Sequence, residues 1–176
     1  MPAANFESAV KEDKLRQLLH IWYSHCHAGE IPNRDDIDIE KIPYLLWSNL
    51  YMYQRTKDER FRAVFTATGI VASYYREAVG RHLDEMTAWR ESDVATRVFL
   101  ECAINKLPVY IHADSEPFEG TYAPFARLLL PLRGGDGSAQ FVFGNVEFFD
   151  RVNVTDRPPD KDYRLIIQAT KEDIPC

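Results

Sequence analysis

Residues 50–66 read LYMYQRTKDERFRAVFT, two runs of aromatic and β-branched residues on either side of a charged segment. Such side chains favour extended backbone, and the interval Thr56-Lys57-Asp58-Glu59 has the polar composition of a turn. The pattern predicts a β-hairpin formed by residues 50–53 and 61–66. An antiparallel sheet therefore begins before the helical segments that follow it in the chain.

Helices are expected to interrupt the strands after this hairpin. One helical stretch spans 70–79 and ends at Gly80, and a longer helix spans 92–106 with apolar residues recurring on one face. The strand pattern then resumes three times, at 109–112, 125–132 and 141–149, with the glycine-rich turn 134–137 between the last two.

This order of elements predicts an α+β domain with a five-stranded, mainly antiparallel sheet whose helices cover one face. Beyond Arg151, the tail opens with Arg157-Pro158-Pro159-Asp160 and then has one apolar stretch, 163–170. That stretch fits an additional strand or a helix, and both alternatives stay open.

The N-terminal part is expected to be a helical extension. Residues 12–28 place apolar side chains at helical spacing before Gly29, and 31–38 form a connector to a short helix over 39–47 that Asp38 caps. The apolar stripe packs on the domain's own core, the usual role of an amphipathic helix, or on a second copy of the chain. As a hypothesis, a homodimer would use Leu15, Leu19 and Trp22.

Composition restricts the class of protein. A length of 176 residues, 45% of them apolar and 27% charged, is typical of one globular domain. The net charge of −6 and the lack of a basic cluster predict that nucleic acid is not a partner. Without a signal peptide or long apolar run, we expect a cytoplasmic protein with no membrane contact. Three widely spaced cysteines predict neither disulfides nor a zinc site.

Several local strings resemble a bacterial subfamily of PAS domains that open with a tryptophan-bearing helix. They are Ile31-Pro32-Asn33-Arg34-Asp35-Asp36-Ile37-Asp38, 61–69, Gly80-Arg81-His82-Leu83, and Leu130-Pro131-Leu132 followed by the glycine turn and 141–144. The resemblance implies a PAS fold, a pocket between sheet and helices, and a role in sensing or protein association. It divides the chain into an extension (1–48), a PAS-like core (49–152) and a tail (153–176). Thr68-Gly69 departs from the Gly-Thr common in the family.

Aromatic and histidine side chains of the core are the candidates for a ligand pocket, since alternation along strands turns about half of them inward. His82 and His112 would suit a haem-binding PAS domain, although a lone histidine is more often structural. Flavin photochemistry is disfavoured, because no cysteine lies in an Asn-Cys-Arg motif. The pocket set is Tyr53, Phe65, Tyr74, Tyr75, His82, Tyr110, His112 and Phe143.

A metal site and a catalytic site are both unexpected. His20, His25, Cys26 and His27 point in different directions on a helix or lie two turns apart. No nucleophile, metalloprotease or phosphate-loop motif occurs. The sequence therefore predicts a PAS-type sensor, not an enzyme, that binds a small molecule or a signalling protein. The alternatives are an interaction module without ligand, or a cavity-based isomerase or hydrolase using His112, Asp114 and Glu116.

Overall fold

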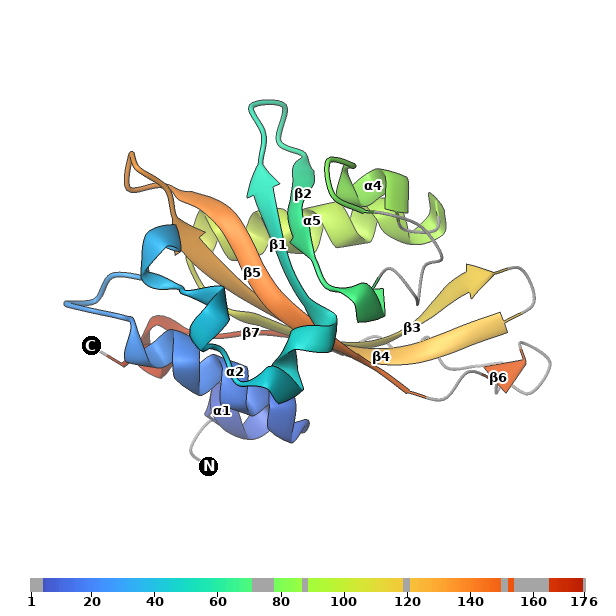
Figure 1. The fold of residues 1–176 in the computed structure, drawn as a ribbon, viewed down its shortest axis with the longest axis horizontal. Coiled ribbons are helices and arrows are strands. Elements are labelled where there is room, and N and C mark those ends of the chain that lie inside the picture. The colour runs from blue at the N-terminus through green and yellow to red at the C-terminus, as the bar shows by residue number, and fades with distance from the viewer. Residues whose placement is uncertain are drawn as a thin grey trace.

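The computed structural model describes residues 5–70, 78–86, 89–118, 121–149, 152–153 and 165–175. Their strands form one antiparallel sheet in the order β2-β1-β5-β4-β3-β7, with β6 paired to β4 (Figure 1). The strands are β1 (Leu50–Arg55), β2 (Phe61–Thr66), β3 (Val109–Phe118), β4 (Thr121–Arg133), β5 (Ala139–Phe148), β6 (Val152–Asn153) and β7 (Leu165–Gln168).

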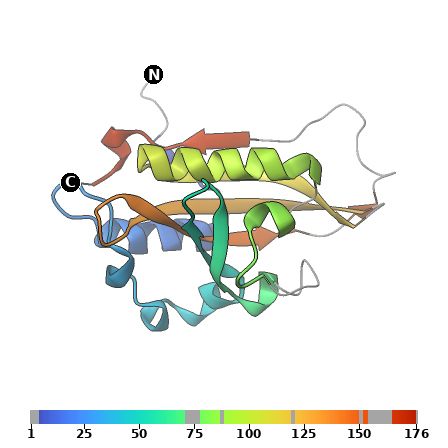
Figure 2. The ribbon, with the colours of Figure 1, turned by 90° about the horizontal axis from the view of Figure 1, so that it is seen from above.

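Two helical layers cover this sheet from opposite sides (Figure 2). One layer contains α5 (Trp89–Asn105), which contacts β3, β4 and β5, with α4 (Leu83–Met86) beside it. The other contains α2 (Asp13–Ser24), which contacts β4 and β5. The remaining described helices are α1 (Phe6–Ala9) and the short 3₁₀ segments η1 (Arg34–Asp36), η2 (Ile39–Lys41), η3 (Tyr44–Asn49) and η5 (Lys171–Asp173).

The five expected strands are confirmed, and so is the hairpin of β1 and β2. The expected long helix begins earlier, at Trp89, and the first helix ends earlier, at Ser24. Asp38 does cap the next turn by accepting from the Glu40 N–H (3.1 Å), but the segment that follows forms η2 and η3 instead of one α-helix. Most of the helix expected over 70–79 falls outside the described residues.

The open question of the tail is answered in favour of a strand. β7 pairs antiparallel with β3, joining Val109 to Gln168 and His112 to Leu165. Further along, the Asp173 carboxylate accepts a hydrogen bond from the Phe6 backbone N–H (3.1 Å). The two ends of the described chain therefore meet beside the sheet (Figure 1).

The expectation of helices on one face only was wrong, because the sheet is apolar on both faces. Leu128, Leu129, Leu130 and Leu132 of β4 are all fully buried, although neighbours on a strand point to opposite sides. A continuous apolar run of this kind is the pattern of a strand covered twice. α2 supplies the second cover.

The dimer role of Leu15, Leu19 and Trp22 was also wrong, because all three are fully buried within one chain. The Trp22 indole N–H donates to the Pro131 carbonyl of β4 (3.0 Å), which fixes α2 against the sheet. The connector is held in the same way, since Arg133 donates from its backbone N–H to Pro32 O and from Nε to Ile31 O. Within the described residues, no helix combines the length and apolar character needed to cross a bilayer.

Replacing Trp22 by alanine should lower the free energy of unfolding by about 3–5 kcal/mol, because it removes a fully buried ring and leaves the Pro131 carbonyl unpaired. Urea denaturation measures the change. The matched control is Trp47→Ala, whose ring is 37% exposed and which should cost less. Equal losses in the two variants would show that α2 is not an essential cover.

Candidate functional site

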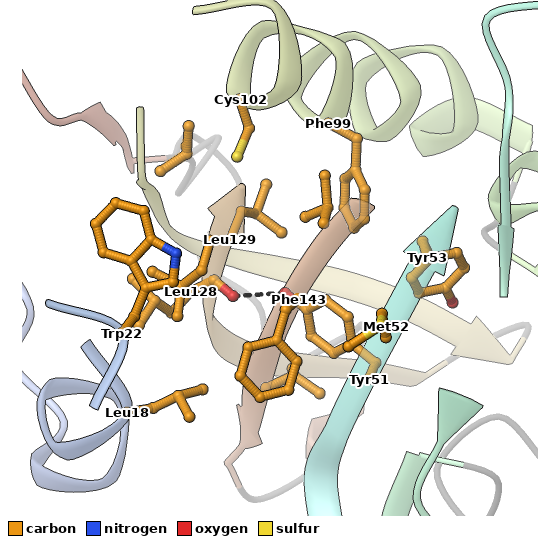
Figure 3. Packing of buried hydrophobic residues seen from close by; sticks show 14 of the residues in the cluster. Leu18, Trp22, Tyr51, Met52, Tyr53, Phe99, Cys102, Leu128, Leu129 and Phe143 are labelled. Atoms are coloured by element: carbon orange, nitrogen blue, oxygen red, sulfur yellow. Dashed lines mark hydrogen bonds between the residues drawn. The ribbon is translucent and has the colours of Figure 1, made fainter. Parts of the chain in front are cut away.

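Aromatic side chains from three elements meet between α5 and the sheet. Strand register places Tyr51 opposite Gly144 and Tyr53 opposite Val142 and Ala63, so both tyrosines face α5. Phe99 of α5 lies against both rings, with centroids 6.2 Å from Tyr51 and 5.5 Å from Tyr53. Phe61 of β2 completes the cluster at 5.4 Å from Phe99. Figure 3 shows Phe99 and Cys102 facing the sheet from α5, and Trp22 and Leu18 facing it from α2.

Tyr51 lies across the sheet because position 144 has no side chain. A Cβ atom there would lie 1.9 Å from the Leu128 carbonyl oxygen and 2.5 Å from the Tyr51 hydroxyl oxygen. Because Gly144 has no Cβ atom, the Tyr51 hydroxyl reaches Leu128 O and donates a 2.6 Å hydrogen bond to it, drawn as a dashed line in Figure 3. The bond satisfies a buried carbonyl and holds the ring against β4 and β5.

A charged residue lies buried on the same side of the sheet. Arg127 of β4 is 8% exposed, and its guanidinium carbon lies 5.4 Å from the ring centroids of both Tyr51 and Phe125. Guanidinium groups stack favourably on aromatic faces and stay charged at every physiological pH. The α5 side therefore combines an aromatic layer with a buried arginine that packs against it.

The predicted pocket residues do not all face this site. Of the set, Tyr53 faces α5, whereas Phe143 alternates with Gly144 and faces the α2 side. Tyr110 also faces α2, because its hydroxyl donates to Glu12 Oε2 (3.0 Å). His112, two residues further along β3, shares that side and stacks on Phe149 at 5.6 Å.

Strand alternation therefore divides a set that the sequence treated as one pocket, and the grouping of Tyr110, His112 and Phe143 with Tyr53 was wrong. Phe65 pairs with Met52, across a bulge from Tyr53, and so faces the α2 side too. Tyr74 and Tyr75 lie outside the described residues.

His82 lies at the outer edge of β2, beside an ion-pair cluster. It forms an isolated bridge with Arg62, and its Nδ1 lies 3.5 Å from Glu85 Oε1. Arg60 Nε and Nη2 reach the two carboxylate oxygens of Asp84 at 2.9 and 2.8 Å. The hydrogen bonds from Arg60 lower the pKa of Asp84 below its usual value. These contacts join α4 to the first strand pair.

The histidine and cysteine cluster has contacts of a structural kind. His20 Nε2 lies 2.7 Å from Glu7 Oε1, His25 Nδ1 lies 2.8 Å from Ile21 O, and Cys26 Sγ is buried near Trp22 O. Among the described residues, no three His, Cys, Asp or Glu side chains are grouped to hold a metal ion. The side chains of Asp114 and Glu116, named for an enzymatic alternative, are not among those described.

Two residues of the α5-side cluster were missed as site residues: Phe99 and Arg127. A signal existed for Arg127, which interrupts the apolar strand Phe125-Ala126-Arg127-Leu128-Leu129-Leu130. A charge inside a strand covered on both faces must be buried, and buried charges are rare unless they have a task.

The family model of the PAS domain matches residues 10–147. The chain therefore belongs to the PAS domain family, and that membership supports a sensory or regulatory role. The match runs from α2 to β5, across the boundary expected at residue 48. No curated protein matches the chain.

Some solved structures are similar to the chain at low sequence identity. A structure of the Vibrio cholerae VqmA dimer without its target DNA is 12% identical, with a TM-score of 0.50, over 65% of this chain and 52% of VqmA. A Vibrio cholerae VqmA–ligand–DNA complex is 14% identical at a TM-score of 0.49, over 64% and 51%. A C-terminal domain from Streptococcus mutans is 19% identical at a TM-score of 0.40, over 63% and 84%.

These comparisons correct the exclusion of a nucleic-acid partner. VqmA, which has the same fold, is described as a DNA-binding LuxR-type receptor, and the chain spans about half of its length. Net charge averages over the domain, so a value of −6 does not exclude DNA as a partner of a longer protein that contains such a domain.

Replacing Gly144 by alanine should lower the free energy of unfolding by about 3 kcal/mol or more, because the new methyl group overlaps the Leu128 carbonyl and displaces the Tyr51 hydroxyl. Chemical denaturation measures the loss. Gly135→Ala is the control, since a Cβ atom there meets nothing within 4 Å. A Gly144→Ala protein as stable as this control would contradict the close packing of Tyr51.

The Arg60–Asp84 pair should make stability depend on acid pH. Because the pKa of Asp84 is lowered in the folded state, its contribution is present above the unfolded value of about 3.9 and is lost as pH falls through the folded value. Asp84→Asn should therefore lose less stability than the wild type between pH 5 and 2, measured by urea unfolding at each pH. Parallel pH curves would rule out this coupling.

Proposed function

We propose that this PAS domain is a sensor that binds a small molecule on the α5 side of its sheet and signals by contact with another protein. The observation that carries the proposal is the placement of a buried guanidinium, Arg127, against Tyr51 and Phe125 on the side of the sheet that α5 covers. Apolar surroundings with a few placed polar groups are the usual composition of a small-molecule site.

Two features support signalling through α5. Phe99 packs on both strands of the first hairpin through Tyr51, Tyr53 and Phe61, so a ligand beneath the helix would act on β1 and β2 together. The ion pair of Arg60 with Asp84 joins the same hairpin to α4. A change in the position of α5 would therefore act directly on β1 and β2 at the edge of the sheet.

An exposed apolar surface supports protein contact as the output. Tyr44 and Leu45 of η3 are 86% and 72% exposed, whereas their neighbour Leu46 is buried. Adjacent exposed large apolar side chains mark surfaces that bind other proteins. A regulatory output at DNA is compatible with this proposal, because VqmA, which shares the fold, is described as a DNA-binding receptor.

Native mass spectrometry of freshly purified protein tests the proposal. We expect a mass above that of the 176-residue polypeptide, with the excess lost on denaturation. A Phe99→Trp variant should retain less of the excess, because the larger ring fills space between α5 and the sheet. A bare mass, both after purification and after incubation with a cell metabolite extract, would contradict ligand sensing and favour a module that acts by protein contact alone.

A further inference from the structure

A cavity of about 350 Å³ lies at one end of the molecule, where three distant segments of the chain meet. The connector after α2 contributes residues 29–31, the end of α5 contributes 105–107, and the tail contributes Lys171 and Ile174. Figure 2 shows the three segments at the same end of the molecule, with η5 in red. A cavity of this volume is large enough for a small molecule.

The apolar part of the lining is aliphatic. Ile31 is 4% exposed, and Leu107 and Ile174 are partly buried against the core. The residues that line the cavity include no aromatic ring. A short hydrocarbon chain would lose contact with water on such a surface, which favours its binding.

The polar part of the lining carries an excess of positive charge. Lys106 and Lys171 are exposed, and neither ammonium lies within 4 Å of a carboxylate in the described part of the chain. The Lys106 Nζ has a long contact of 3.5 Å with the Gly137 carbonyl. Glu30, the acidic residue of the lining, lies 3.6 Å from Nη1 of Arg133, which balances its charge. The two lysines therefore leave the cavity attractive to an anion.

Lys106 also stands where glycine is the usual residue. It follows α5 with a φ of 56°, in the left-handed region, and the Leu107 N–H donates to the Cys102 carbonyl (3.3 Å), as in a Schellman cap. A side chain with a Cβ atom makes this conformation less stable. The backbone therefore does not favour lysine at this position, whereas a task for its ammonium at the cavity accounts for it.

We infer that this cavity binds a small aliphatic carboxylate, with its hydrocarbon chain on the aliphatic lining and its charge attracted by Lys106 and Lys171. The inference goes beyond the proposed function, because the lining residues take no part in the aromatic cluster around Phe99. A bound acid would join the connector, α5 and the tail, and it would stabilise the folded chain by mass action.

The probes are butanoate, hexanoate and octanoate, each compared with its neutral amide by NMR titration of the isotope-labelled protein and by thermal unfolding. The acids should bind at least about fivefold more tightly than the amides, a difference of about 1 kcal/mol. Added salt should reduce this preference by screening the lysines. The largest shifts of amide signals should fall at residues 29–31, 105–107 and 171–174.

Lys106→Gly gives a readout that a purely structural role would not give. Glycine adopts the left-handed conformation without strain, so the Tm of the ligand-free variant should rise by about 2 °C while its preference for acids falls. Lys171→Ala should weaken the preference as well. The matched control is Lys57→Ala, which removes an exposed positive charge from the turn between β1 and β2 and should keep the preference.

Equal binding of acids and amides, or no binding of any probe, would overturn the inference. A preference that survives in both Lys106→Gly and Lys171→Ala, or that Lys57→Ala lowers equally, would overturn it too. Shifts concentrated at Tyr51 and Tyr53 would place the acid beneath α5 instead of in this cavity. None of these results decides the proposed function, which the retained mass and Phe99→Trp test separately.

Discussion

A central sheet with two apolar faces is the constraint on which the structure depends. Consecutive buried residues on β4, Leu128 to Leu130, make both faces of the sheet apolar. Both faces must therefore be shielded from solvent by other elements. α5 covers one side and α2 the other (Figure 2). The N-terminal segment is thereby committed to the core through Trp22 and Pro131. Because α2 is fixed in this way, we propose that the α5 side is the one that responds to a ligand.

Much of the fold was predictable because strand composition and turn chemistry are local properties. The hairpin around residues 56–59, the strands β3, β4 and β5, and the cap at Asp38 all follow from short-range preferences. Elements that depend on distant partners were not predictable in the same way. The strand at Leu165–Gln168 exists through its pairing with β3, and the 3₁₀ turns after Asp38 are held by contacts such as Asn145 with Leu46. Periodicity does not report such pairings.

The site was less predictable than the fold. The alternation of side chains along a strand divides them into two sets, but it does not say which set faces α5 and which faces α2. Tyr53 and Tyr110 are both tyrosines and both buried, yet they lie on opposite sides of the sheet. They differ in their contacts, since Tyr53 packs on Phe99 whereas Tyr110 donates a hydrogen bond to Glu12. Arg127 was within reach of sequence reasoning, because a charge in a doubly covered strand is a local anomaly. Its position over Tyr51 also depends on Gly144, which comes from another strand.

Hydrogen–deuterium exchange tests the central claim, that the α5 side responds to ligand while the α2 side is a fixed cover. The comparison is between protein as purified and protein refolded after removal of small molecules. The account predicts faster exchange after removal at amides of 94–105 in α5 and of β1, with unchanged protection in α2. A change concentrated in α2, or none in either layer, would contradict it.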